Sequence, residues 1–100
     1  MQYILRELES FKVWRESVRD RRARVAIARR IERVQNGNFG DHESVGGCVS
    51  ELRVHVGAGY RVYFTIRGNE LVILLVGGDK KSQKADIKRA KKLGAEIFES

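Results

Sequence analysis

The chain has 100 residues, enough for one hydrophobic core, so residues 1–100 are expected to form a single domain. Apolar residues make up 42% and charged residues 33%, and no segment is apolar for long enough to cross a bilayer, which excludes a membrane-spanning protein. With 20 Lys and Arg against 13 Asp and Glu, the net charge is +7, which favours nucleic acid or an acidic protein as the partner.

The first part of the chain predicts a strand followed by two helices. Residues 2–8 favour the strand, and Ser10 is a candidate N-cap for the first helix. Its apolar residues recur at helical spacing: Phe11, Trp14 and Val18. A second, arginine-rich helix is predicted from about Arg21 to Asn36-Gly37. Its apolar stripe consists of Ala23, Ile27, Ile31 and Val34. Residues 38–47 predict a connection that holds at most one short strand, around residues 42–45.

From about residue 50 the apolar period changes to two, which predicts strands. Residues 51–56 and 60–67 form a predicted hairpin around Gly57-Ala58-Gly59, and Gly68-Asn69 predicts the next turn. Residues 71–76 are apolar on both faces, as in a strand that is covered on both sides. A last helix follows Ser82, with the apolar stripe Ile87, Ala90, Leu93 and Ile97. The predicted fold class is α+β: a small curved antiparallel sheet of three to five strands, with two N-terminal helices and one C-terminal helix packed on it.

One face of the predicted hairpin is polar. It carries Glu51, Arg53 and His55 on one strand and Arg61, Tyr63 and Thr65 on the next. A turn that places Val56 opposite Tyr60 would pair His55 with Arg61, and two arginines beside the ring would keep it neutral and able to accept a proton. Like charges across strands are tolerated when an anion bridges them, which predicts an anionic ligand; a solvated polar face is the alternative.

The loop VGGDKKSQ at residues 76–83 is not a Walker A loop, because Asp79 separates Gly78 from Lys80. Its two glycines allow a close approach of the backbone to a ligand, and its lysines and the amides at the start of the last helix favour an anion. A plain turn with solvated lysines is the alternative interpretation.

Seven arginines lie between Arg19 and Arg33 and are suited to nucleic acid, an acidic partner or water. Two histidines and the single Cys48 provide too few ligands for a metal constellation, so no metal or other cofactor is expected. Residues 1–10 show no signal-peptide pattern, which makes the cytoplasm the expected location.

Three segments carry a resemblance to a known family: RRARVAIARRIERVQNGNFGD at 21–41, ELRVHVGAGYRVYF at 51–64 and LLVGGDKKSQKADIKRAKKL at 74–93. Together they resemble the RelE/ParE superfamily of toxins from type II toxin–antitoxin modules, and more narrowly the HigB-like addiction-module killer group. The resemblance implies a compact microbial-RNase-type toxin that cleaves mRNA in the ribosomal A site without metal. It also implies neutralisation by an antitoxin, with which higher assemblies are expected.

By motif, the resemblance assigns the positions around the scissile phosphate to Arg53, Arg61 and Lys80. For the base it leaves His55, Glu51 or a lysine, while Tyr63 stacks on a base or positions the phosphate. Further RNA contacts are expected from Lys81, Gln83 and Lys84. The general acid stays open, because Gln83 or Asp86 stands where relatives often carry Tyr or His. Two alternatives remain: a ParE-like toxin that inhibits DNA gyrase by binding, and an inactive family member.

Overall fold

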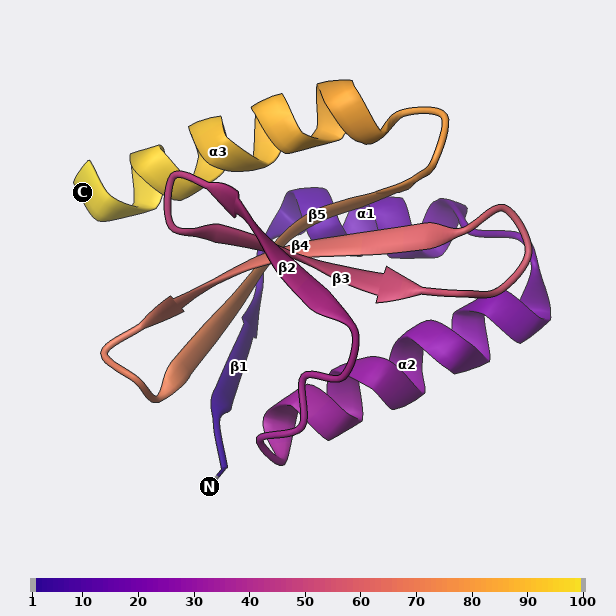
Figure 1. Cartoon of the computed structure of the whole chain (residues 1–100), viewed down its shortest axis with the longest axis horizontal. Helices are drawn as coiled ribbons and strands as arrows, with labels where there is room; N and C mark the ends of the chain where they lie inside the picture. Colours follow the sequence, from indigo (N-terminus) through magenta and orange to yellow (C-terminus); the bar gives the residue numbers. More distant parts are fainter. Residues whose placement is uncertain (1, 100) are drawn as a thin grey trace.

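The computed structural model of the chain describes residues 2–99, which form a five-stranded sheet between helices (Figure 1). The strands are β1 (Ile4–Glu7), β2 (His42–Gly46), β3 (Val49–Val54), β4 (Tyr60–Arg67) and β5 (Leu71–Asp79). The helices are α1 (Glu9–Ser17), α2 (Arg21–Gln35) and α3 (Gln83–Glu99). α3 lies on one side of the sheet and α2 on the other, so the predicted α+β architecture is confirmed. None of the helices within residues 2–99 has the length and apolar composition needed to span a membrane.

β1 differs from the expected antiparallel arrangement. The strand order is β1-β5-β4-β3-β2, and β1 runs parallel to β5, with Ile4 opposite Leu71 and Glu7 opposite Leu74. Tight turns make β3, β4 and β5 antiparallel, whereas two helices and three strands separate β1 from β5 along the chain. No local turn therefore sets the direction of β1, and only tertiary packing decides it.

Each face of the sheet has its own core, and β5 contributes to both. The first core lies under α1 and α2 and contains Phe11, Ala23, Ile27, Ile31, Val34, Leu52, Val62, Val72 and Leu74. The second lies under α3 and contains Val49, Tyr63, Ile73, Leu75, Val76 and Ala90. The buried stripes of α2 and α3 and the doubly covered β5 are thus confirmed.

The start of α1 differs from the prediction. Leu8, not Ser10, occupies the N-cap position and makes no side-chain cap. The Ser10 hydroxyl instead donates a hydrogen bond to the Leu75 carbonyl at 2.6 Å and so ties α1 to β5. At α2 the cap is Asp20, whose side chain accepts from the backbone amides of Arg22 and Ala23.

The β3–β4 hairpin pairs in a register two residues away from the predicted one. Val54, not Val56, lies opposite Tyr60, and Arg53 lies directly opposite Arg61. Residues 55–59 form the connection, in which Gly57 and Gly59 have positive φ values of 56° and 77°. A shift of two residues keeps every side chain on its predicted face, because side chains alternate with a period of two, but it changes which residues are neighbours.

Gly77 on β5 makes room for an aromatic ring. A Cβ atom added there would lie 2.3 Å from the Trp14 ring, so the indole packs directly on the glycine backbone. We expect Gly77→Ala to lower the free energy of unfolding by about 1–3 kcal/mol, because the ring has to move. Urea denaturation of Gly77→Ala, Trp14→Ala and the double variant measures this. With the indole removed the added methyl group has space, so additive losses in the double variant would contradict the contact.

Candidate active site

The candidate site lies across three neighbouring strands. Arg53 on β3 and Arg61 on β4 are directly opposite each other, and Gly78 on β5 is opposite Arg61 on its other side. The side chains of both arginines share the sheet face on which α3 packs, together with Tyr63. Two guanidinium groups in directly opposed positions repel each other, so this pair requires an anion between them.

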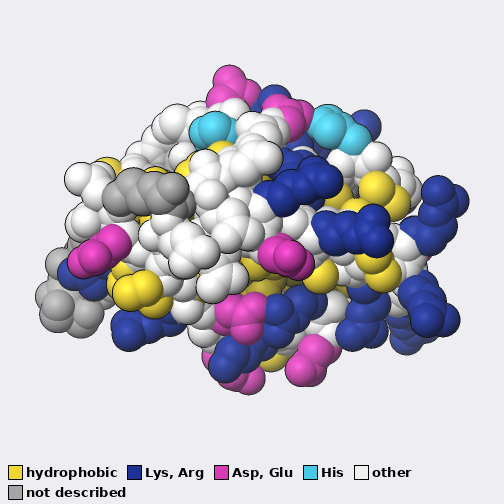
Figure 2. Space-filling view, turned by 90° about the horizontal axis from the view of Figure 1, so that it is seen from below, with side chains coloured by type: hydrophobic (Ala, Val, Ile, Leu, Met, Phe, Trp, Pro, Cys, Tyr) yellow, Lys and Arg dark blue, Asp and Glu magenta, His cyan; other side chains and the backbone are white. Residues whose placement is uncertain are grey.

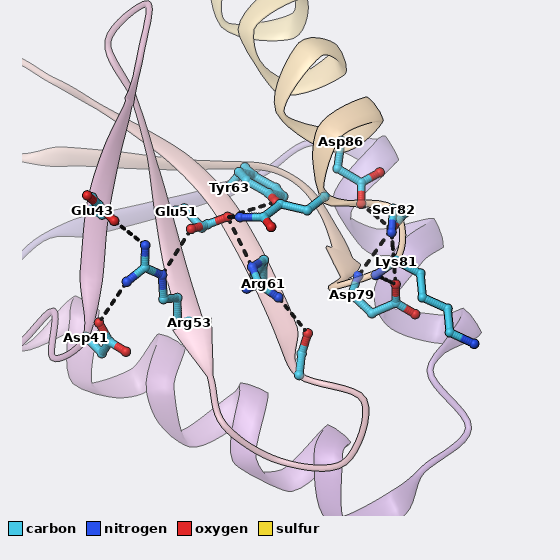
Figure 3. A network of polar contacts seen from close by, with 12 residues as sticks. Asp41, Glu43, Glu51, Arg53, Arg61, Tyr63, Asp79, Lys81, Ser82 and Asp86 are labelled. Carbon is cyan, nitrogen blue, oxygen red and sulfur yellow. Dashed lines mark hydrogen bonds and ion pairs between the residues drawn. The ribbon is translucent and has the colours of Figure 1, made fainter.

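That anion is the carboxylate of Glu51, which is 1% exposed (Figure 3). Its Oε2 accepts from Arg53 Nε at 3.1 Å, and its Oε1 lies 3.2 Å from Arg61 Nε. Oε1 also accepts from the Tyr63 hydroxyl at 3.1 Å and from Gln83 Nε2 at 2.8 Å. A residue of this chain therefore provides the bridging anion that the sequence led us to expect from a ligand.

Arg61 is held less completely than its ion pair suggests. Arg61 Nε is close to Glu51 Oε1 but not aligned with it, and it is buried without a hydrogen bond. Its Nη1 donates to the Gly59 carbonyl at 3.1 Å, and 13% of the side chain is exposed. Arg61 thus lies between the buried carboxylate and the surface at the end of the hairpin.

Carboxylates also surround the outer side of Arg53. Its guanidinium binds Glu43 of β2 and lies 3.7 Å from an oxygen of Asp41. Hydrogen bonds to Glu43 and Glu51 raise the pKa of Arg53 above its usual value. Three carboxylates therefore meet two guanidinium groups here, so the positive charge of both arginines is balanced by acidic residues of the chain.

His55 does not lie beside Arg61, which corrects the predicted pairing. It follows β3, outside the paired residues, and its Nε2 contacts Asp41 Oδ2. The hydrogen bond from His55, and then the charge of Arg53, lower the pKa of Asp41 below its usual value. The ring of His55 thus contacts the carboxylate of Asp41, which orients it, and does not lie between the two arginines of the predicted pairing.

Tyr63 is a buried hydrogen-bond donor. Burial, followed by the charge of Glu51, raises the pKa of the Tyr63 hydroxyl well above its usual value. The hydroxyl therefore stays protonated at neutral pH and donates to Glu51. The ring has no exposed surface on which a nucleobase could stack, and its hydroxyl is engaged by Glu51.

The loop between β5 and α3 is closed by its own side chains. Asp79 Oδ1 accepts from the backbone amides of Lys81 at 2.9 Å and Ser82 at 3.2 Å. A Cβ atom on Gly78 would lie 1.7 Å from Asp86 Oδ2, which also binds the Ser82 hydroxyl. The amides and the glycine that were expected to receive an anion are thus occupied by acidic residues of the chain.

The lysines of this loop take different positions. The stem of Lys80 lies over Gly59, where an added Cβ atom would be 2.7 Å from its Cε, so Lys80 reaches the same turn that Arg61 binds. Lys81 points away from the cluster (Figure 3). Lys84 is exposed on α3. Of the predicted site residues, the structure brings together Glu51, Arg53, Arg61, Tyr63 and Gln83, with Lys80 beside them.

Two participants were missed by reasoning from the sequence. Asp41 and Glu43 come from the connection and the short edge strand β2, and they reach Arg53 only because β2 pairs with β3, Glu43 opposite Glu51. Their one signal was the alternation of charged residues around 41–43, which is equally typical of a solvated loop. Within residues 2–99 no three His, Cys, Asp or Glu side chains are grouped so as to hold a metal ion.

Comparison with known proteins identifies the family. The profile of the family described as phage derived protein Gp49-like (DUF891) matches residues 17–96. The chain belongs to this family. An uncharacterized protein of Haemophilus influenzae is 48% identical to this Gp49-like chain over 88 residues, which cover 88% of the chain and 89% of that protein.

The Gp49-like chain also has a known fold. It matches a solved structure of E. coli toxin RelE, a double arginine-to-alanine mutant in the free state, with a TM-score of 0.70 and 18% sequence identity. The match covers 92% of this chain and 97% of that chain. The RelE-like fold and the predicted membership of the RelE/ParE superfamily are thereby confirmed. The narrower HigB-like assignment stays a prediction.

Proposed function

We propose that this Gp49-like chain is the toxin of a type II toxin–antitoxin pair and cleaves mRNA on the ribosome. Support comes from the family, from the RelE fold, and from one arrangement: Arg53, Arg61 and Lys80 converge at one end of the sheet. The proposal places the protein in the cytoplasm with a neutralising antitoxin as its partner. A binding-only toxin of the gyrase-inhibiting kind has no comparable support from a specific contact.

The proposed chemistry is attack of the RNA 2′-oxygen on the adjacent phosphorus, with departure of the 5′-oxygen. Arg61 and Lys80 are assigned to the charge that develops on the phosphate. Arg53 joins them when the phosphate replaces the exposed Glu43, whose side chain is 63% exposed, as its outer partner. Glu51 is the positioning residue that holds both arginines, since its oxygens are already occupied and buried.

Among the candidate bases, we assign the proton of the 2′-hydroxyl to His55. Its side chain is 69% exposed, and its Nε2 contacts Asp41, which also lies beside Arg53. An Nε2–H donated to Asp41 leaves the Nδ1 lone pair of a neutral ring facing away from the carboxylate. This is the geometry of a histidine base that is oriented by an acidic residue. Glu51 and Tyr63 lack that access because they are buried.

Primer extension on a defined mRNA tests the proposal. Purified protein is added to a translating extract, to the same mRNA without ribosomes, and to a supercoiling reaction that contains DNA gyrase. We expect new 5′ ends within codons at the ribosomal A site, and only where ribosomes translate. Intact mRNA with arrested supercoiling would replace this proposal with the gyrase-inhibiting alternative, and intact mRNA with normal supercoiling would indicate an inactive member.

A further inference from the structure

A groove on the face opposite the candidate site runs along α2. Its volume is about 670 Å³, and its wall consists of α2 on one side and the end of β3 with the start of the hairpin loop on the other. The lining residues are Arg21, Arg22, Val25, Ala26, Arg29, Arg30, Arg33, Val54, His55 and Val56. Viewed from the α2 side, Lys and Arg side chains gather around apolar patches on the right of the molecule (Figure 2).

The floor of the groove is aliphatic and incompletely covered. Val25 in the N-terminal half of α2 is 46% exposed, although the buried stripe of the same helix is almost completely covered. Val56 and Ala26 are partly buried and pack against the first core beside it. An exposed apolar strip that continues a core and is rimmed by charge is typical of a surface for a protein partner.

Four arginines on the rim have no acidic partner in the described part of the chain. Within residues 2–99, no carboxylate forms an ion pair with Arg21, Arg22, Arg29 or Arg33. Arg29 and Arg33 are four residues apart on one helix, a spacing at which like charges destabilise the helix. Arg30 differs, because its guanidinium binds the carbonyls of Phe39 and Asp41 and so forms part of the wall. An acidic partner would neutralise the rim.

The pattern of lining residues on α2 fits a helix. They form two rows at a spacing of four: Arg21, Val25, Arg29 and Arg33 in one, and Arg22, Ala26 and Arg30 in the other. Such rows are the ridges between which the side chains of a second helix pack. RNA fits less well, because the lining contains no Phe, Tyr or Trp on which bases could stack and its centre is aliphatic.

We propose that this groove, defined by the lining residues above, binds an amphipathic helix with an apolar stripe and acidic flanks. Its role as the docking site of the neutralising partner rests on the proposed function. The groove and the Glu51–Arg61 cluster lie on opposite faces of the sheet, under α2 and α3 respectively. His55, the proposed base, is the one residue that both lines the groove and belongs to the proposed machinery. Substitutions on α2 therefore change contact at the groove without touching the residues assigned to the chemistry.

Fluorescence anisotropy with a designed helical peptide tests the proposal. The probe carries leucines at positions i, i+4, i+7 and i+11 with glutamates on both flanks, and the control peptide has the same composition in scrambled order. We expect Val25→Asp to weaken binding of the probe about tenfold or more, since it removes an apolar contact and adds a negative charge that repels the glutamates of the probe. Val13→Asp on α1, a matched change at an exposed valine outside the groove, leaves binding within about twofold.

Charge on the rim is tested in the same way. Arg29→Glu and Arg24→Glu make the same change of charge on α2, but only Arg29 lines the groove. We therefore expect only Arg29→Glu to weaken binding of the probe strongly. Equal binding of the scrambled peptide, or an undiminished affinity of Val25→Asp, overturns the proposal. The proposal is also overturned if the wild type forms a dimer that Val25→Asp dissociates. It is overturned as well if an RNA oligonucleotide competes with the probe and Val25→Asp and Arg29→Glu abolish binding of that RNA.

Primer extension with the same variants separates this proposal from the proposed function. Val25→Asp is expected to cleave mRNA like the wild type, which also shows that it is folded. If the wild type cleaves no mRNA but binds the probe, and Val25→Asp abolishes that binding, the docking proposal is supported and the nuclease proposal is contradicted. If the wild type cleaves mRNA but does not bind the probe, the nuclease proposal is supported and the docking proposal is contradicted.

Discussion

Glu51→Ala is expected to lower the free energy of unfolding by about 3 kcal/mol, because it removes the one anion between two directly opposed arginines. The loss also leaves the Tyr63 hydroxyl buried without its acceptor. For a chain of this size such a loss corresponds to a fall of roughly 12–24 °C in the midpoint of thermal unfolding. Circular dichroism with temperature and urea measures both quantities.

A matched control is available on the same arginine. Glu43 also binds Arg53, but its side chain is 63% exposed, so Glu43→Ala is expected to cost no more than about 1 kcal/mol. Glu51→Gln should fall between the two, because the amide oxygen still accepts from Tyr63 while the charge is lost. If Glu51→Ala and Glu43→Ala have the same small effect, Glu51 is not the residue that holds the site together.

Arg61→Ala is expected to reduce mRNA cleavage by about 10²–10³-fold, since it removes a donor aimed at the charge developing on the phosphate. The fold should survive, because Glu51 keeps Arg53, Tyr63 and Gln83 as donors. Primer extension at a temperature well below the measured midpoint of unfolding quantifies the cut sites. Thermal unfolding of the same sample confirms that the loss is one of chemistry.

Two further variants sharpen this result. Arg24→Ala makes the same substitution on an exposed part of α2 and should leave cleavage unchanged. Arg61→Lys keeps the positive charge but loses the planar guanidinium group that reaches both the Gly59 carbonyl and the Glu51 carboxylate. We therefore expect its mRNA cleavage to lie between that of Arg61→Ala and that of the wild type. Cleavage by Arg61→Ala within tenfold of the wild type would remove Arg61 from the mechanism.

The sequence predicted helices and strands well where one periodicity dominated. The stripe of α2, the alternation in β3 and β4 and the doubly apolar β5 all reflect burial on one face or on two, which a pattern of apolar residues records directly. The N-cap of α1 was wrong because a serine hydroxyl that is satisfied by a distant carbonyl looks the same in sequence as one that caps a helix.

The candidate site could be predicted by residue but not by contact. Glu51, Arg53, Arg61 and Tyr63 were placed correctly on one face, because a register error of two residues preserves the face. The contacts of these residues were not predicted correctly. His55 contacts Asp41 and not Arg61, and Arg53 binds Glu43, which lies on the edge strand β2 outside the hairpin. The occupied amides of the β5–α3 loop likewise depend on the conformation of Asp79.

By itself, then, the sequence determined which residues are buried and which face each side chain takes, because these follow from periodicity along a single segment. Only the tertiary structure decided that the anion between Arg53 and Arg61 belongs to the chain, and that an arginine-rimmed groove lies behind the sheet. Both features depend on contacts between segments far apart in the sequence, and such contacts are set by the packing of the sheet between its helices.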